Sequence, residues 1–369
     1  MKAAHSLLWV RAIGQARGLP RNQGKAAILH YPDIAEPGLG TGAISRVAEG
    51  VQWLRMPVPG SLEAINLWVL AGKRGWTLVD SGLNMQDTQA AWQTALSGPL
   101  SGNPVERLCL THMHPDHSGL AGWLVEANPG AELWISRLEF FVLRSLAAAT
   151  GQSVPDAAIA FFRRAGWREA ELDGYRRIFG SFGRMVYTLP ESFVAMVDGD
   201  VIDTGLSQWE VVTGRGHSPE QSLLYSRELE ILIAGDQILP GISPNVSVYP
   251  QEPKADPLTD YLRSLAHIRH RVPDRVLVLP SHGKPFRGLH ARIESLIDGH
   301  EQALRRLHDT LQRPKRAVDA FGTLFKRGIT GEHMVMATGE SLAHLACLRT
   351  RGLAASTIDA DGIEWWQAT

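Results

Sequence analysis

The pattern of apolar and polar residues predicts several short strands in the first third of the chain. Between Val51 and Gly82, the runs VQWLRMPV, INLWVLAG and WTLVDSG alternate apolar and polar positions and are separated by turn residues. The run NMQDTQAAWQTAL has helical spacing, and VERLCLT is a further compact β-type run. Strands, a helix and another strand are therefore predicted to precede the segment THMHPDHSGLAGW, which begins at Thr111.

The middle of the chain changes from helical to β-type patterns. Apolar residues recur at helical spacing over 120–126, 138–149 and 155–186, and residues from about 137 to 190 are interpreted as a helical insertion. The runs VIDTG, QWEVVTG, ELEILIAG and DRVLVLP then predict four strands, and helices are predicted over 257–271 and 289–312. Three of these four runs end shortly before a residue type that can bind a metal ion.

The two ends of the chain differ in character from this central part. After Pro314, two or three short helices and a small hairpin are predicted, which we interpret as a winged-helix-like module over 313–369, docked on a catalytic domain that spans 46–312. Residues 1–45 are expected to form an N-terminal arm. Its first 25 residues carry five basic residues and no acidic one, so we expect a mobile basic arm, and a transit peptide is the alternative interpretation.

Composition excludes several classes of protein. The chain has 369 residues, of which 44% are hydrophobic and 20% charged, and its net charge is −1. No run approaches the roughly 18 apolar residues of a membrane span, and the charge balance indicates neither nucleic acid nor an anionic membrane as a partner. Cys109 and Cys347 lie far apart in dissimilar segments, which disfavours a disulfide and favours a reducing compartment. A cytoplasmic protein is therefore expected.

The segment THMHPDH contains four candidate metal ligands directly after a predicted strand. A histidine-rich surface loop, with Asp116 capping a helix, is the alternative interpretation. The pattern recurs downstream, however, because three further candidates follow β-type runs that end in Gly, Pro or Ser. The predicted ligands are His112, His114, Asp116, His117, His217, Asp236 and His282.

These seven side chains are sufficient to hold two divalent cations. The predicted arrangement is His112, His114 and His217 on one ion, Asp116, His117 and His282 on the other, and Asp236 as a bridge. Two ions about 3.5–4 Å apart, each with a position for solvent, generate hydroxide near neutral pH. Zinc is the first choice for imidazole and carboxylate ligands, and the same set accepts iron or manganese.

Four motifs together resemble the metallo-β-lactamase superfamily of metallohydrolases. They are H-x-H-x-D-H at 112–117, G-H at 216–217, G-D at 235–236 and S-H-G at 281–283. The resemblance implies an α/β (α+β) fold, an αββα sandwich of two halves that meet at the metals. It also implies that Asp80 lies beneath the first metal loop, although Asp80 could instead be a turn residue.

The branch of the superfamily is indicated by the bridging position. Because Asp236 stands where the antibiotic-degrading branch uses a cysteine, β-lactam hydrolysis is disfavoured. The glyoxalase II-like and lactonase-like branches use the set found here. The C-terminal tail resembles a lactamase-β-2-like subgroup that includes thioester-type hydrolases and an RNA-cleaving enzyme.

The function expected from these features is hydrolysis of an ester, thioester or lactone by a metal-bridging hydroxide. Asp116 is the predicted catalytic residue, which orients the hydroxide and moves its proton. Two alternatives remain open: a persulfide dioxygenase with one iron on His112, His217 and Asp236, and a metal-dependent ribonuclease. The balanced charge and the acidic run STIDADGIE make nucleic acid the less favoured substrate.

Three further expectations concern the surroundings of the site. A small-molecule substrate is the expected partner, and a homodimer is a possible assembly. Aromatic side chains of the insertion either form a wall of the pocket or pack in a core of their own; they are Phe140, Phe141, Phe161, Phe162, Trp167 and Tyr175. The other histidines, including His267, His270, His300 and His308, are interpreted as ordinary surface or packing residues.

Overall fold

The computed structural model describes residues 29–326 and 328–369. The basic stretch of the expected N-terminal arm therefore lies outside the described residues. The rest of the arm, residues 29–45, runs along the outside of the fold, where the Glu36 carboxylate forms ion pairs with Arg55 and Lys284 at 2.7 Å each. None of the described helices is both long and apolar enough to span a bilayer.

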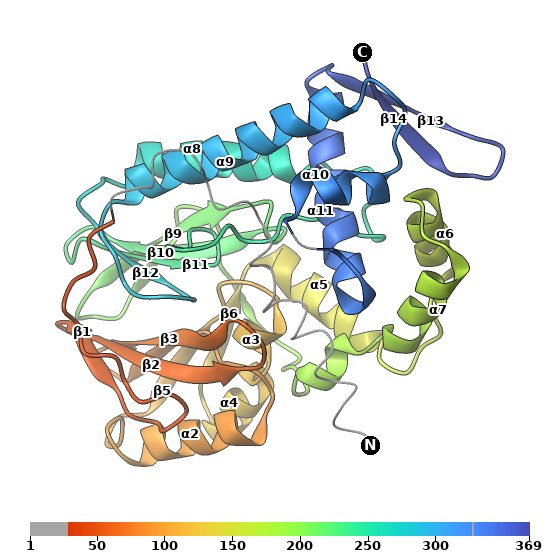
Figure 1. The fold of residues 1–369 in the computed structure, drawn as a ribbon. Coiled ribbons are helices and arrows are strands. Elements are labelled where there is room, and N and C mark those ends of the chain that lie inside the picture. The colour runs from red at the N-terminus through yellow and green to blue at the C-terminus, as the bar shows by residue number, and fades with distance from the viewer. Residues whose placement is uncertain (1–28, 327) are drawn as a thin grey trace.

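Two β-sheets stack face to face at the centre of the molecule (Figure 1). The first sheet has seven strands in chain order: β1 (Ser45–Ala48), β2 (Val51–Val58), β3 (Glu63–Ala71), β4 (Trp76–Val79), β5 (Val105–Cys109), β6 (Glu132–Ile135) and β7 (Val194–Ala195). The second has five, in the order β12 (Leu277–Pro280), β11 (Ile231–Gly235), β10 (Gln221–Ser226), β9 (Gln208–Gly214) and β8 (Val201–Asp203).

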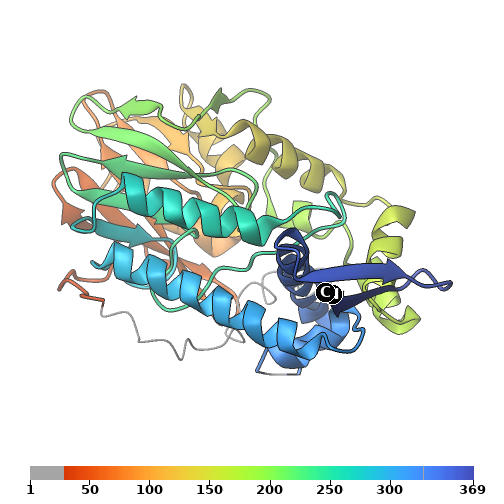
Figure 2. The ribbon, with the colours of Figure 1, turned by 90° about the horizontal axis from the view of Figure 1, so that it is seen from above.

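Helices cover the outer face of each sheet (Figure 1). The first sheet is covered by α2 (Gln86–Ser97) and α4 (Ala121–Ala127), and the second by α8 (Pro257–Arg271) and α9 (Leu289–Thr310). Seen from above in Figure 2, α8 and α9 lie side by side. This layering confirms the expected αββα sandwich, and the helices predicted over 257–271 and 289–312 are confirmed.

Side chains of β2 alternate between the two faces of the first sheet, so this strand contributes to two apolar cores. Leu54, Met56 and Val58 face the helices, whereas Trp53 faces the second sheet. Register then pairs Trp53 with Trp68 of β3, and their rings stack with centroids 5.8 Å apart. The inner faces of both sheets are thus held together by a continuous apolar layer.

Strand β10 was not among the strands predicted from the sequence, although it lies in the middle of the second sheet. Its run QSLLYS begins and ends with polar residues, so it lacks a clear apolar pattern. In the fold these residues are buried and bonded: Gln221 Nε2 donates to the Ala234 carbonyl at 3.2 Å, and the Ser222 amide donates to the Thr111 carbonyl at 2.8 Å. Tertiary hydrogen bonds therefore allow the polar residues of β10 to be buried in the sheet.

The C-terminal region packs closely on the sandwich. It contains the short helices η2 (Ala317–Ala320), α10 (Phe321–Leu324) and η3 (Gly331–His333), the long helix α11 (Met334–Thr350) and the hairpin of β13 (Ala354–Ile358) and β14 (Glu364–Ala368). Almost all of α11 is buried, with contacts to α8 and α9. The expected docking of this region on the main body is confirmed, and the winged-helix interpretation stays a prediction.

The helical insertion contains α5 (Arg137–Ala148), α6 (Asp156–Arg164), α7 (Glu169–Ile178) and η1 (Phe182–Met185). Phe162 and Trp167 pack against Met334 and Val335 of α11, and Trp167 Nε1 donates to Thr338 Oγ1 at 2.8 Å. Phe140 stacks on Phe193 instead. Phe140, Phe162 and Trp167 therefore pack in cores or against α11, whereas Phe141 is 56% exposed.

Candidate metal centre

Every predicted ligand follows a strand, and the strand ends meet at one edge of the sandwich. The first four ligands follow β5, at the loop that leads into α3 (Pro115–Ser118). His217 follows β9, Asp236 follows β11, and His282 follows β12. Both pairs β4–β5 and β11–β12 are parallel, so their carboxyl ends point the same way. The structure brings all seven residues together.

The ligand atoms form overlapping clusters in which all atoms lie within 4.8 Å of one another. The clusters are His112, His114 and His217; His112, His117 and Asp236; and Asp116, His117 and His282. Within the first, His114 Nδ1 lies 2.8 Å from His112 Nε2 and 3.1 Å from His217 Nε2. The first and third clusters are the two ligand sets expected from the sequence, and the second connects them through Asp236.

For His217 and His282, hydrogen bonds to groups outside the clusters fix which ring nitrogen faces the centre. His217 Nδ1 is 2.8 Å from the Asn245 carbonyl oxygen, and His282 Nδ1 is 2.7 Å from the Ala64 carbonyl oxygen. Because a carbonyl oxygen only accepts, both Nδ1 atoms carry the proton. The Nε2 lone pairs of these two rings are consequently directed to the centre, as a metal ligand requires.

Asp80 supports the first metal loop from below. Its carboxylate accepts hydrogen bonds from the Thr111 amide at 2.7 Å and from Thr111 Oγ1 at 2.8 Å, and it lies 2.8 Å from His117 Nδ1. Asp80 adopts a φ of 64°, a left-handed conformation that is costly for a residue with a Cβ. The location beneath the loop agrees with the position implied by the family resemblance.

Two supporting residues were not found by sequence reasoning. Glu139 of α5 is buried, and its two carboxylate oxygens accept from the Met113 amide at 2.9 Å and the Glu220 amide at 2.7 Å. One side chain therefore connects the loop of His112 and His114 with the loop of His217. Its only sequence signal is Ser136 three residues earlier, which resembles a helix cap.

Asn66 of β3 supports the third loop in the same way. Its Nδ2 donates to the carbonyls of Pro280 and Gly283, which flank His282, at 2.8 and 2.7 Å. An asparagine in the middle of a predicted strand gives no indication of this role, because its partners lie more than 200 residues away in the chain.

Several buried polar atoms of the predicted ligands have no hydrogen-bond partner, as expected for a site that binds a cation. Among the predicted ligands, five buried atoms have no hydrogen-bond partner: both carboxylate oxygens of Asp116, one oxygen of Asp236, and Nε2 of His117 and of His282. Buried polar atoms are rarely left unpaired, because each one costs about 1–3 kcal/mol. These five atoms lie together at one centre, where a divalent cation would satisfy lone pairs that no protein group satisfies.

The protonation states of His112, His114 and Asp236 suit metal binding. Burial lowers the pKa of His112 well below its ordinary value and that of His114 to about 3, which keeps both imidazoles neutral. Burial opposes ionisation of Asp236, but the neighbouring His282 and His117 outweigh it and hold the pKa of this carboxyl well below its usual range. Neutral imidazoles and ionised carboxylates are the forms that bind metal ions.

Negative charge predominates around His117. Burial opposes protonation of His117, yet the carboxylates of Asp80, Asp236 and Asp116 outweigh it and raise the pKa of this imidazole well above its ordinary value. Three carboxylates around one ring create the negative potential that would also stabilise a divalent cation.

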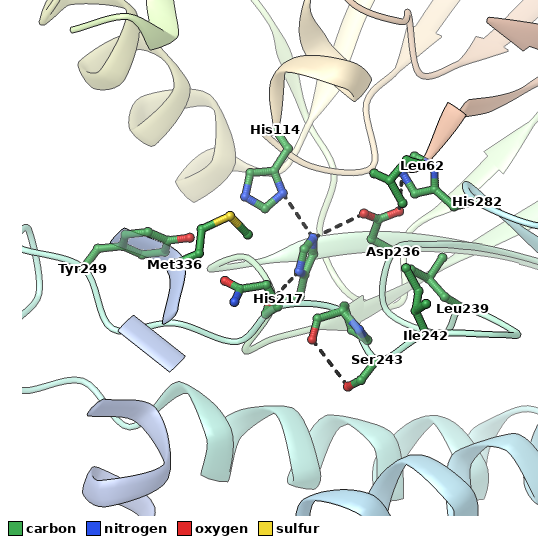
Figure 3. A pocket seen from close by; sticks show the side chains of 12 residues that line it. Leu62, His114, His217, Asp236, Leu239, Ile242, Ser243, Tyr249, His282 and Met336 are labelled. Atoms are coloured by element: carbon green, nitrogen blue, oxygen red, sulfur yellow. Dashed lines mark hydrogen bonds and ion pairs between the residues drawn. The ribbon is translucent and has the colours of Figure 1, made fainter. Parts of the chain in front are cut away.

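A pocket opens beside these residues (Figure 3). His114, His217, Asp236 and His282 form its metal side, and Ser243 and Asn245 are its other polar residues. The remaining lining residues are Leu62, Leu239, Ile242, Pro244, Tyr249 and Met336. Met336 belongs to α11, so the C-terminal region contributes directly to the pocket. The insertion contributes none of the lining residues, which answers the question left open for its aromatic side chains.

Comparison with known proteins agrees with this geometry. The sequence profile of the metallo-beta-lactamase superfamily matches residues 60–282, and that of the metallo-beta-lactamase-like C-terminal domain matches residues 304–369. The crystal structure of a beta-lactamase domain protein from Burkholderia ambifaria superposes on this one with a TM-score of 0.81. The two sequences are 35% identical, and the match covers 92% of this chain and 99% of that chain.

Two curated relatives carry functional names. A Bacillus subtilis (strain 168) protein named "Probable metallo-hydrolase YqjP" is 25% identical over 81% of this chain and 92% of its own length. The Gallus gallus "Acyl-coenzyme A thioesterase MBLAC2" is 25% identical over 65% of this chain and 80% of its own length. With the profile match and the clustered HxHxDH-type residues, these similarities establish that the chain belongs to the metallo-β-lactamase superfamily and is a metallo-hydrolase.

Proposed function

We propose that this protein hydrolyses a carboxylic thioester or ester, lactones included, whose acyl part is apolar. The observation that carries the proposal is the composition of the pocket: apolar side chains stand opposite the ligand residues, and none of the 12 lining residues is Lys or Arg. A phosphodiester would bring a permanent negative charge into this pocket, where only the bound cations and no cationic side chain would receive it. A neutral carbonyl group would not.

The thioester class is supported by one relative. The Gallus gallus protein that matches 65% of this chain is named an acyl-coenzyme A thioesterase, and thioesters combine an apolar acyl group with a good leaving group. The lining residues Leu239 and Ile242 near Asp236, and Met336 near Tyr249, would contact such an acyl group (Figure 3). Their burial against it would contribute roughly 25 cal/mol per Å² of apolar surface.

Two bound divalent cations would supply a hydroxide near neutral pH and neutralise the charge that develops on the carbonyl oxygen. The chain's own residues would hold the reactants in place. His112, His114 and His217 would hold one cation, Asp116, His117 and His282 the other, and Asp236 would keep their spacing. Zinc suits this donor set best.

Asp116 is the residue we assign to proton transfer. Burial opposes its ionisation, but His117 and His282 outweigh burial and lower the pKa of its carboxyl. Its Oδ2 lies 3.3 Å from His282 Nε2, and neither of its oxygens has a hydrogen-bond partner. An ionised carboxylate with free acceptor positions can orient an attacking water and accept its proton.

The persulfide dioxygenase alternative needs only one iron, on His112, His217 and Asp236. The third cluster, formed by Asp116, His117 and His282, favours two cations because a single-iron site leaves its buried atoms unsatisfied. Metal analysis of the purified protein distinguishes the two: about two metals per chain are expected for the hydrolase, and one iron per chain with oxygen uptake on a persulfide for the oxygenase.

The experiment that tests the function is a substrate screen on metal-loaded protein. Acyl-coenzyme A thioesters of increasing chain length, aryl esters, lactones, bis-p-nitrophenyl phosphate and glutathione persulfide are supplied to the wild type, to Asp116→Asn and to the surface control Asp87→Asn. We expect turnover of a carbonyl substrate by the wild type and the control only. Exclusive turnover of the phosphodiester or the persulfide would contradict the proposal.

A further inference from the structure

Helix α11 contacts the pocket loop backbone to backbone. This loop, residues 236–256, follows β11 and supplies six of the residues that line the pocket besides Asp236 itself, among them Asn245 and Tyr249. The Val248 amide donates to the Gly339 carbonyl of α11 at 3.0 Å. A Cβ at position 339 would lie 2.7 Å from Ser247 Cβ, so only glycine permits this approach.

The approach brings Glu340 of α11 against Asn245. Glu340 is only 3% exposed, and its Oε2 accepts a hydrogen bond from Asn245 Nδ2 at 2.9 Å. The backbone carbonyl of the same asparagine accepts the hydrogen bond from His217 Nδ1 at 2.8 Å. Asn245 therefore joins a carboxyl group of the C-terminal region to an imidazole of the metal centre.

The location of Glu340 is costly for folding. Its Oε1 is buried and has no hydrogen-bond partner, and burial raises the pKa of the carboxyl to about 8. An apolar residue of similar size would avoid the cost of burying this group. A glutamate that destabilises its own surroundings, and whose single hydrogen bond leads to a metal ligand, indicates a role in the site.

We propose that Glu340 is a positioning residue of the metal centre, which acts through Asn245 to hold the His217 imidazole in its ligating orientation. Glu340 fixes the Asn245 side chain, and Ser247 Oγ fixes it from the other side by donating to Asn245 Oδ1 at 2.6 Å. With the side chain held at both ends, the Asn245 carbonyl keeps its direction toward His217 Nδ1. The C-terminal region thereby controls metal affinity.

Groups that hydrogen-bond the distal nitrogen of a ligating histidine typically change metal affinity about 10- to 100-fold when they are removed. Glu340 acts one residue further away, through the Asn245 side chain, so we expect a loss toward the lower end of that range. This inference concerns the metal centre and does not depend on the substrate class proposed above.

The test measures binding of Zn²⁺ by competition with a chromophoric chelator, together with the visible spectrum of the Co²⁺-loaded protein. Full-length Glu340→Ala should bind Zn²⁺ about tenfold more weakly and show an altered Co²⁺ spectrum. Glu340→Gln keeps an oxygen that can accept from Asn245 Nδ2, so it should restore both properties. The matched control is Thr338→Val, which alters a buried polar group on the same helix that bonds Trp167 instead.

A double-mutant cycle separates this role from general packing. Asn245→Ala removes the amide that Glu340 contacts but keeps the backbone carbonyl that receives His217, so Glu340→Ala should cause no further loss in that background. Wild-type affinity in Glu340→Ala, an equal loss in Thr338→Val, or additive losses in the cycle would overturn the proposal. If Glu340→Ala does not fold, as judged by circular dichroism, Glu340→Leu fills the same volume and takes its place in the cycle.

Discussion

The Asp80 carboxylate lies directly beneath the His117 ring, with Asp80 Oδ2 2.8 Å from His117 Nδ1. The same carboxylate receives two hydrogen bonds from Thr111, the residue that precedes the first ligand. One aspartate in a strained left-handed conformation thus holds both ends of the ligand segment 111–117. A strained conformation of this kind persists where the surrounding contacts hold it in place.

Replacing Asp80 by Asn should weaken metal binding without unfolding the protein. The amide keeps the shape of the carboxylate, but it removes the negative charge that faces His117 and can accept through one oxygen only. We expect a loss of about 10- to 100-fold in Zn²⁺ affinity. Competition titration with a chelator measures this loss, and unchanged affinity would show that Asp80 serves only the turn.

Replacing Glu139 by Gln should loosen the two loops that this side chain connects. Glutamine offers one acceptor oxygen, so either the Met113 amide or the Glu220 amide loses its partner. A buried unpaired amide costs about 1–3 kcal/mol, which urea unfolding of the metal-free protein detects. Glu132→Gln, on the exposed side of β6, serves as the control and should leave the stability unchanged.

Replacing Met336 by Ala should change substrate preference if the proposed function is correct. The variant removes the apolar side chain that α11 contributes to the pocket, so substrates with longer acyl groups should show a kcat/KM lower by roughly tenfold, mainly through KM. Met334→Ala is the matched control, because Met334 lies on the same helix but packs against the insertion. Equal effects of both substitutions would indicate a general disturbance of α11.

The buried imidazole of His344 predicts a specific dependence of stability on pH. Burial lowers its pKa to about 4, whereas in the unfolded chain it titrates near its ordinary value of 6.5. The unfolded state therefore binds the proton first, and the contribution of His344 to stability is lost as the pH falls from about 6.5 to about 4. Each pH unit in this window costs at most about 1.4 kcal/mol.

His344→Gln should remove this contribution. Urea unfolding of the variant should show a smaller decrease of stability between pH 6.5 and 4.5 than the wild type. His267→Gln, which changes an exposed histidine, should follow the wild type. The comparison with the wild type is essential, because Glu340 has a raised pKa and acts in the opposite direction. Parallel pH profiles for all three proteins would contradict the prediction.

Local sequence patterns were sufficient to predict most of the individual strands and helices. Strands such as β2 alternate between two buried faces, and helices such as α8 begin with Pro257 directly after the capping Asp256, so their signals lie within a few residues. The same holds for the ligand motifs, because each one follows a strand closely. Their convergence could be expected from the resemblance between the motifs and a known superfamily.

Supporting residues other than Asp80 gave no such signal. The sequence indicates only a surface or packing role for His300; the structure buries it, with its Nε2 3.1 Å from Oγ of Ser243, which lines the pocket. The aromatic residues of the insertion could equally have lined the pocket or formed a core. The location of Phe162 and Trp167 depends on the docking of α11, which no pattern in residues 137–190 encodes.

The amino-acid sequence by itself indicated most of the strands and helices and the candidate ligand residues, because hydrophobic periodicity and strand-end motifs act over short distances. The αββα layering was implied by the resemblance of those motifs to a known superfamily. Only the tertiary structure decided which side chains besides Asp80 orient those ligands. Asn66, Glu139 and Glu340 reach partners dozens to hundreds of residues away, and a buried polar group reveals its role only when its hydrogen-bond partner is in place.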